Sequence, residues 1–266
     1  MPYIFAPHAQ ALASPTPVAG RPELRLFALL DGARATAPIK RHLRALQSLP
    51  SQHIFEDSFA KAALHLSPVL MQLSDSEDSR LVQVLALDQA CSELPMLTFI
   101  RSALSLTALA SKLRELLLVE VEHSPYLLRF ADPQMLCAAN SVFTPAQRSA
   151  FFGDIDAWST VDFRSAMDDA ADPARYPRAL PATPLPIAFD AEQTSALLAA
   201  VAVPVLASQI GNLDSSFTAA LTHAEQTAFA AECIEAAGDD AADEAQLVSA
   251  ALQRWRLASA RTEVSA

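Results

Sequence analysis

The sequence predicts an α/β N-terminal lobe with a mixed sheet flanked by helices, followed by an all-helical C-terminal lobe. Three observations lead to this expectation. Short apolar runs alternate with amphipathic helical patterns over the first part of the chain, as in layered α/β folds. Five prolines then fall between Pro173 and Pro186, a density that no regular element tolerates. Beyond them only helical periodicities occur.

These observations divide the chain into five parts. We expect a flexible arm rich in Pro and Ala, an α/β lobe, a Pro-rich linker, a helical lobe and a short tail. Their limits are residues 1–20, 21–165, 166–188, 189–260 and 261–266.

The first lobe begins with a buried strand. Residues 24–30 form an apolar run that is closed by Asp31 and Gly32. A helix should follow, with Thr36 as its cap. The next predicted elements are a strand over 69–73, a helix over 79–93, a strand over 96–101 and a helix that contains Leu106, Leu109, Leu113 and Leu116.

A hairpin comes next. Residues 119–122 alternate apolar and acidic side chains, as a half-exposed strand does. Ser124-Pro125 predicts a turn, after which residues 126–130 return as a second strand. Arg129 would then lie in an apolar strand, where a buried guanidinium must be paired. Asp31 and Asp132 both lie near strand ends, so either could be its partner.

Two helices close the first lobe. Asp132 can cap a helix whose first residue is Pro133, because proline lacks the N–H that would be unpaired there. Thr144 and Gln147 have the spacing of a capping box. We expect this second helix to end at Gly153 in a left-handed conformation.

The C-terminal lobe shows the same start and stop signals. Asp190 predicts the start of an apolar helix, and Thr222 with Glu225 forms another capping box. Gly238 should end that helix. The last helix is lined by Leu247, Val248, Leu252 and Trp255.

Composition excludes several classes of protein. The 266 residues carry a formal net charge of −11, whereas a general nucleic-acid binder normally has a basic surface patch. We therefore expect no general nucleic-acid binding. With only five glycines there is no nucleotide-cradling loop system. The three cysteines are widely spaced and form no C-x-x-C pair. We expect them to be small buried side chains of a protein in a reducing compartment.

The chain is expected in the cytoplasm. Its start has no positive charge and no unbroken apolar run, so we reject a secretory signal. The most apolar stretch, residues 196–207, is short for a membrane span and contains Pro204. We therefore expect no membrane association.

Motifs that carry catalysis or bind cofactors are absent from the sequence. Asp154 and Asp156 form a D-x-D, which is more often a solvated turn than a metal site. No cofactor, metal or small-molecule substrate is expected. A nucleophile and base that meet only in three dimensions stay open as an alternative.

One segment resembles a known family. It runs from Leu127-Leu128-Arg129-Phe130-Ala131-Asp132-Pro133 through Thr144-Pro145-Ala146-Gln147 to Phe151-Phe152-Gly153-Asp154-Ile155 and Trp158. This order of features is similar to the signature of type VI secretion effector chaperones, also called adaptors, and the resemblance covers about residues 24–163. The sequence departs from the family pattern at Ala131, where an aromatic residue is usual, and at Ser67, where a glycine often stands.

The resemblance implies a two-lobe, non-enzymatic protein that binds a toxic effector in the producing cell. It would help load this effector onto the spike protein, so its partners would be the effector and the spike. Two alternatives stay open. One is an immunity-type inhibitor of a toxin, and the other is an enzyme that uses carboxylates of Asp154, Asp156 or Asp31.

The signature residues can be structural or can contact a partner. Arg129 with Asp132 is expected to fix the corner between strand and helix rather than to touch cargo. Phe151 and Phe152 are expected in the core. Trp158 suits the core and an exposed anchor equally, because tryptophan is favoured at binding hot spots.

Overall fold

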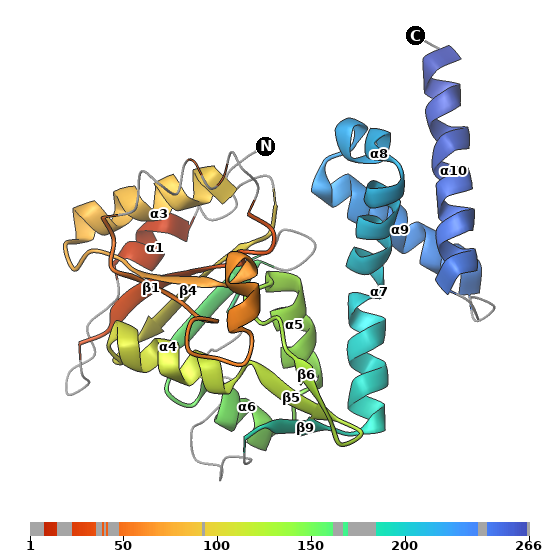
Figure 1. The fold of residues 1–266 in the computed structure, drawn as a ribbon. Coiled ribbons are helices and arrows are strands. Elements are labelled where there is room, and N and C mark those ends of the chain that lie inside the picture. Colours follow the sequence, from red (N-terminus) through yellow and green to blue (C-terminus); the bar gives the residue numbers. More distant parts are fainter. Residues whose placement is uncertain are drawn as a thin grey trace. The chain divides into compact units, whose positions relative to one another are not determined.

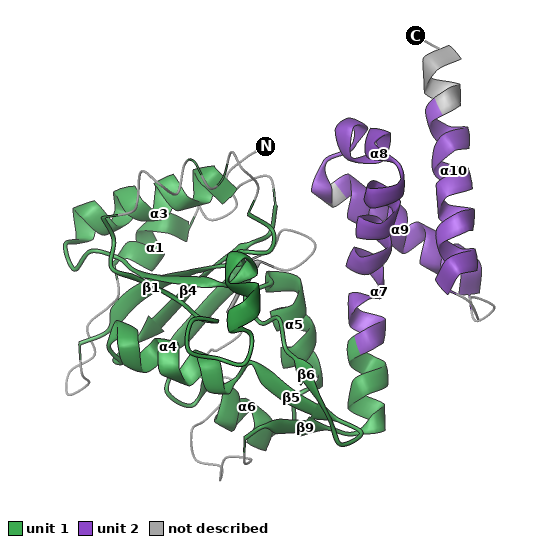
Figure 2. Cartoon of the chain, in the orientation of Figure 1, with its two compact units in different colours: residues 1–197 green, residues 198–266 purple. Residues whose placement is uncertain are grey.

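The computed structural model describes two compact units. Described are residues 8–14, 23–35, 39, 41, 48–91, 94–161, 167–169, 185–238 and 244–264. The units are Met1–Leu197 and Leu198–Ala266 (Figure 2). The predicted fold class is confirmed, because the first unit has sheets flanked by helices and the second is helical. Their boundary lies inside helix α7 (Ala191–Leu213), beyond the predicted limit at residue 188.

The larger sheet has six strands, and all its neighbouring pairs are antiparallel. In spatial order these are β2 (Ser51–His53), β3 (Val69–Gln72), β1 (Arg25–Leu30), β4 (Leu97–Ser102), β7 (Ala157–Val161) and β8 (Met167–Asp169). Strand β1 pairs with β3 and β4 inside the sheet. It is buried on both faces, which explains its unbroken apolar run.

Helices cover both faces of this sheet (Figure 1). On one face, α1 (Ala9–Ala13) and α3 (Glu77–Cys91) pack against the side chains of Leu26, Ala28 and Leu30. The opposite face carries α4 (Leu106–Glu115), α5 (Pro133–Val142) and α6 (Pro145–Phe152). Phe27 and Leu29 point to that second face, as the period of two in a strand requires.

The predicted flexible arm is wrong for the residues of α1. Ala9 and Leu12 are buried in the core that α3 also lines, so burial of apolar surface holds this short helix in place. The guanidinium of Arg101 donates to the carbonyl of Ala11 at 3.2 Å. Residues 1–7 and 15–22 of the expected arm lie outside the described residues.

The smaller sheet has the order β6-β5-β9. Strands β5 (Leu118–Val121) and β6 (Ser124–Leu127) are antiparallel, and β9 (Ile187–Phe189) runs parallel to β5. The expected turn at Ser124-Pro125 is wrong by two residues. The chain turns at Glu122 and His123, whose φ angles of 50° and 62° suit a two-residue hairpin loop.

Pro125 therefore lies in the edge strand β6. The N–H of Leu128 donates to the carbonyl of Leu117 at 2.8 Å, and the hydrogen-bonded positions alternate from there. By this alternation the nitrogen of Pro125 faces away from β5, where a missing N–H breaks no ladder bond. The second strand ends at Leu127 rather than at residue 130, so Arg129 follows it in the chain.

The predicted linker is shorter than expected. Residues 167–169 form β8 at its start, and residues 187–189 form β9 at its end, because each pairs with a strand of a sheet. Residues 170–184 lie outside the described residues. So does most of the helix predicted after Thr36, of which only Ile39 and Arg41 are described.

The caps of α5 and α6 form as predicted. The side chain of Asp132 accepts from the N–H of Gln134 at 3.1 Å. Thr144 and Gln147 bond each other's backbone N–H groups. The left-handed conformation expected at Gly153 is wrong, since its φ is −54°. The chain instead continues in a turn in which Ile155 donates to the carbonyl of Phe152.

The second unit packs four helical segments around Ile210, Phe217 and Trp255. They are the C-terminal part of α7, α8 (Ser215–Ala220), α9 (His223–Ala237) and α10 (Glu244–Val264). The capping box at Thr222 forms, and Gly238 ends α9 with a φ of 56°. Helix α10 continues to Val264, so the tail predicted from residue 261 begins later.

Helix α7 is longer than its apolar centre indicated. It has 23 residues, and a window of 18 has a mean hydropathy of 1.8 and is 22% buried. The expectation that this stretch is too short for a membrane span is wrong, since the helix is by length and composition long and apolar enough to cross one. Part of its apolar surface, at Leu206, Ala207 and Ile210, packs in the core of the second unit.

Gly32 gives the first testable prediction. A Cβ atom at this buried position would lie 2.0 Å from the carbonyl oxygen of Ser67. We expect Gly32→Ala to lower the free energy of unfolding by at least about 2 kcal/mol, because backbone atoms must move apart. Urea denaturation measures this. The exposed neighbour offers a control, Ala33→Ser, and equal stabilities of the two variants would contradict the prediction.

Candidate functional site

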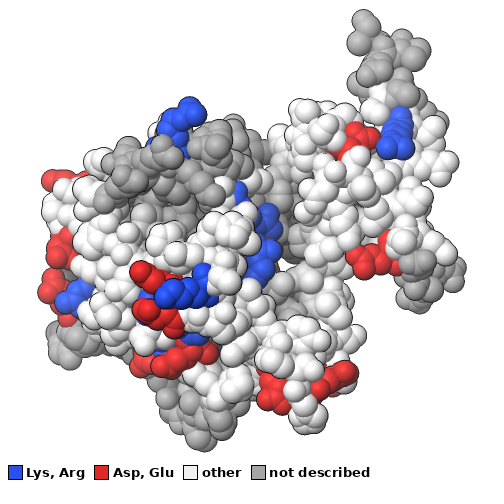
Figure 3. Space-filling model, in the orientation of Figure 1, with Lys and Arg blue, Asp and Glu red and all other residues white. Residues whose placement is uncertain are grey.

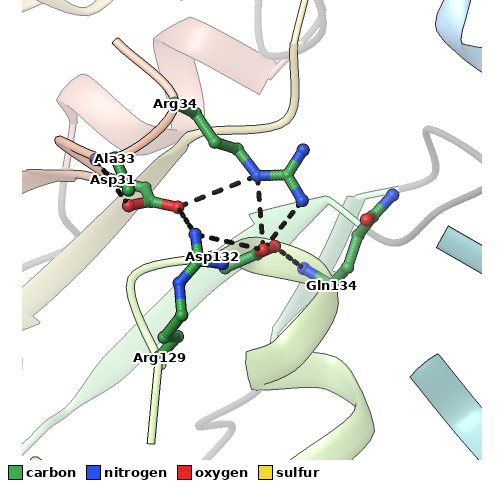
Figure 4. A network of polar contacts seen from close by, with 6 residues as sticks. All are labelled: Asp31, Ala33, Arg34, Arg129, Asp132 and Gln134. Atoms are coloured by element: carbon green, nitrogen blue, oxygen red, sulfur yellow. Dashed lines mark hydrogen bonds and ion pairs between the residues drawn. The ribbon is translucent and has the colours of Figure 1, made fainter. Parts of the chain in front are cut away.

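Four charged side chains meet where β1 ends and α5 begins, and we call them the ion-paired corner. Asp31 directly follows β1, and Arg34 lies three residues further on. Arg129 and Asp132 lie between β6 and α5 (Figure 4). A guanidinium nitrogen of Arg129 is 2.8 Å from Asp31, and one of Arg34 is 2.8 Å from Asp132.

Two longer ion pairs cross-link the corner. Arg34 Nε is 3.7 Å from Asp31 Oδ2, and Arg129 Nη2 is 3.9 Å from Asp132 Oδ2. Of the two partners left open for Arg129, Asp31 is the one that accepts its hydrogen bond. Arg34 was not predicted, although its spacing from Asp31 in the loop after a strand allows an ion pair.

Arg129 is not buried, contrary to expectation. Its side chain is 46% exposed, whereas the side chain of Asp31 is only 4% exposed. The reason is that β6 ends at Leu127, so Arg129 reaches the corner from the segment that joins β6 to α5.

Asp132 holds the corner and starts a helix at the same time. Its Oδ1 accepts from the N–H of Gln134, while its Oδ2 accepts from Arg34. Pro133 is buried as the first residue of α5, where its missing N–H leaves no donor unpaired. The two oxygens of one carboxylate therefore link the end of β1 to α5.

Burial raises the pKa of Asp31 above its ordinary value of 3.8, and the nearby charge of Asp132 raises it further. The charges of Arg129 and Arg34 and the N–H of Ala33 act in the opposite direction. Burial is the largest of these effects. The ion pairs therefore do not fully compensate the free energy that is lost when this carboxylate is removed from water.

Phe151, Phe152 and Trp158 all lie in the core of the first unit. The rings of Phe151 and Trp158 stack with their centroids 5.9 Å apart, and Phe130 meets both edge-on. The indole N–H of Trp158 donates to the hydroxyl of Thr98 at 3.0 Å. Trp158 is fully buried and is thus not an exposed anchor.

A pocket of about 270 Å³ opens beside the ion-paired corner. Asp31 and Arg129 line its polar side. Apolar residues line the remainder, among them Ala63 and Leu66 of η2 (Lys61–Leu66) and the segment 127–128. Phe130 lines the pocket as well, so the pocket rests on the aromatic cluster of the core.

Large exposed apolar side chains lie in the chain segments that form this pocket. They are Phe59, Leu64, Leu66, Tyr126 and Leu127. Of these, Leu66 and Leu127 line the pocket directly. Exposed apolar side chains at a pocket often mark a surface that binds a partner.

The carboxylates considered for catalysis do not line one pocket among the described residues. Asp154 is exposed and lies 3.6 Å from the ammonium of Lys112, and neither Asp154 nor Asp156 lines the pocket beside Asp31. Within the described ranges, no group of three or more His, Cys, Asp or Glu is placed to hold a metal ion. The lining of the pocket offers apolar contacts and the charged side chains of Asp31 and Arg129.

Fold and site together define an α/β domain with an ion-paired corner and an apolar pocket, joined to a helical unit. Residues 26–150, from β1 into α6, match the model of a family described as a domain of unknown function (DUF4123). No curated protein and no solved structure matches the chain.

The raised pKa of Asp31 predicts a pH dependence. A carboxyl with a higher pKa in the folded state contributes stability that is complete below pH 3.8 and is lost as the pH rises through the folded value. Asp31→Asn removes this contribution. We therefore expect the free energy of unfolding of the natural protein, minus that of the variant, to fall with rising pH.

Urea denaturation between about pH 3.5 and pH 6 measures this difference. A difference that grows with pH would mean that the ion pairs outweigh burial, and would contradict the assignment.

Trp158 predicts a structural cost. Trp158→Ala should lower the free energy of unfolding by about 3–5 kcal/mol, because it removes the ring on which Phe151 stacks. Trp158→Phe keeps an aromatic ring and should cost less. Thermal and urea unfolding followed by circular dichroism compare them, and an alanine variant as stable as the natural protein would contradict a core role.

Proposed function

We propose that this protein is a cytoplasmic chaperone, or adaptor, that binds an effector of a type VI secretion system and helps load it onto the spike protein. One observation carries the proposal. The residues on which the resemblance to effector chaperones rests form one connected structure, in which the ion-paired corner joins the aromatic core. Most of this structure falls within the segment that matches the family of unknown function.

The pocket supports a binding role. A chaperone needs surface that is exposed when the protein is free and covered when cargo is bound. The exposed side chains of Leu66 and Leu127, which line the apolar pocket, have this character. Their burial in a complex would supply binding free energy of about 25 cal/mol per Å² of apolar surface.

The charge of the chain supports steering. A net charge of −11 would raise the association rate with a basic region of an effector, and salt would reduce that rate. The helical unit adds a second surface, an open groove that is lined by Leu213 of α7 and by Glu244, Val248 and Leu252 of α10. We assign the choice of a particular effector to this unit, which lies outside the matched segment.

Co-expression tests the proposal. The protein encoded beside this gene as the candidate effector is expressed with and without the chain, and one of the two carries an affinity tag. We expect a stable complex, a higher yield of soluble effector and loss of effector secretion when this gene is deleted. The effector in the complex should keep its toxic activity once released.

Two outcomes would contradict the chaperone. One is an effector that is soluble and secreted without this protein and forms no complex with it. The other is a complex in which the toxin is inactive and which protects a recipient cell, as an immunity protein would.

A further inference from the structure

In the ion-paired corner, the positively charged side chains are more exposed to solvent than the negatively charged ones. The side chains of Asp31 and Asp132 are 4% and 8% exposed, whereas those of Arg129 and Arg34 are 46% and 25% exposed. The carboxylates are thus buried behind the guanidinium groups. In an acidic chain, this corner offers solvent a local positive charge.

Figure 3 draws one face of the molecule, on which some Lys and Arg atoms form a patch with no Asp or Glu atoms beside it. Among the described residues, the ion pairs of Arg129 all use one nitrogen, Nη2. A guanidinium has five N–H donors in a planar fork, so the same side chain can also bind a carboxylate of a partner through its other nitrogens.

The pocket sets the size of the group that binds beside this charge. Its volume of about 270 Å³ exceeds the roughly 150 Å³ of a buried cavity that holds a benzene molecule. It is small for a drug-sized ligand, whose sites begin near 300 Å³. One large apolar side chain fits this space, with Arg129 at its wall.

Two of the chain segments that line the pocket also carry exposed apolar side chains outside the lining. Phe59 and Leu64 are exposed close in sequence to lining residues on one of them, and Tyr126 is exposed next to Leu127 on the other. A ligand that covered both segments would extend beyond the one side chain that fills the pocket.

We propose that this pocket binds a segment of a partner protein in which a large apolar side chain enters the pocket and a neighbouring Asp or Glu pairs with Arg129. The inference rests on the proposed function, since it takes that partner to be the cargo. The apolar contact would supply affinity, and the charge contact would select acidic over basic neighbours of the apolar residue.

Synthetic peptides test the contact without any change to the protein. The probes are six-residue blocked peptides with one Phe and one Glu, one or two positions apart, on a Ser/Gly background. We expect fluorescence anisotropy with the full chain to show binding that weakens at least tenfold when Glu becomes Gln or Lys, and when Phe becomes Ala.

Variants of the protein test the same contact from the other side. Ala63→Trp places a ring in the pocket, and the exposed neighbour on η2 gives the matched control Ala62→Trp. Arg129→Gln should weaken binding at least tenfold, and Arg129→Lys should restore part of it. Urea midpoints show that each variant is folded.

Four results would overturn the inference. The peptides could bind Ala63→Trp as well as Ala62→Trp, or Phe-Gln peptides could bind as well as Phe-Glu peptides. The free chain could also dimerise through this pocket, with Ala63→Trp alone returning it to a monomer. If the full effector binds the natural chain and both tryptophan variants equally, the pocket assignment fails while the chaperone proposal stands.

Discussion

The ion pairs that join the end of β1 to the start of α5 are the constraint on which the first unit depends. Arg34 with Asp132, and Arg129 with Asp31, each bridge 98 positions of sequence. They fix the segment 128–131, which forms one wall of the pocket and inserts Phe130 into the aromatic core. Burial raises the pKa of Asp31 in spite of these partners, so the network positions the chain more than it stabilises it.

The local signals of the sequence predicted much of this architecture. Caps at Asp132, Thr144 and Thr222 depend on a few neighbouring residues, and all three form. The buried strand β1 was also predicted, because a short run of apolar residues that is closed by Asp-Gly is typical of a buried strand. Such features depend on residues within one helical turn or one strand, so the local sequence is enough to predict them.

Features that depend on distant partners were predicted less well. Strand β9 has three residues, and its parallel pairing with β5 gives no local signal. The hairpin turn was misplaced because Pro125 looks like a turn residue unless one knows that β6 is an edge strand. Arg34 could be recognised only once Asp132 was known to lie opposite, and Trp158 only once its stacking with Phe151 was visible.

The proline in β6 affects how readily this edge strand can pair with a second molecule. This strand lies at the edge of a sheet and carries two exposed apolar residues. Such an edge strand can pair with the same strand of a second molecule and so promote aggregation. With no outward N–H at Pro125, a second strand cannot complete its ladder there. The exposed side chains of this strand are therefore available for contacts, whereas its backbone is a poor template for fibrils.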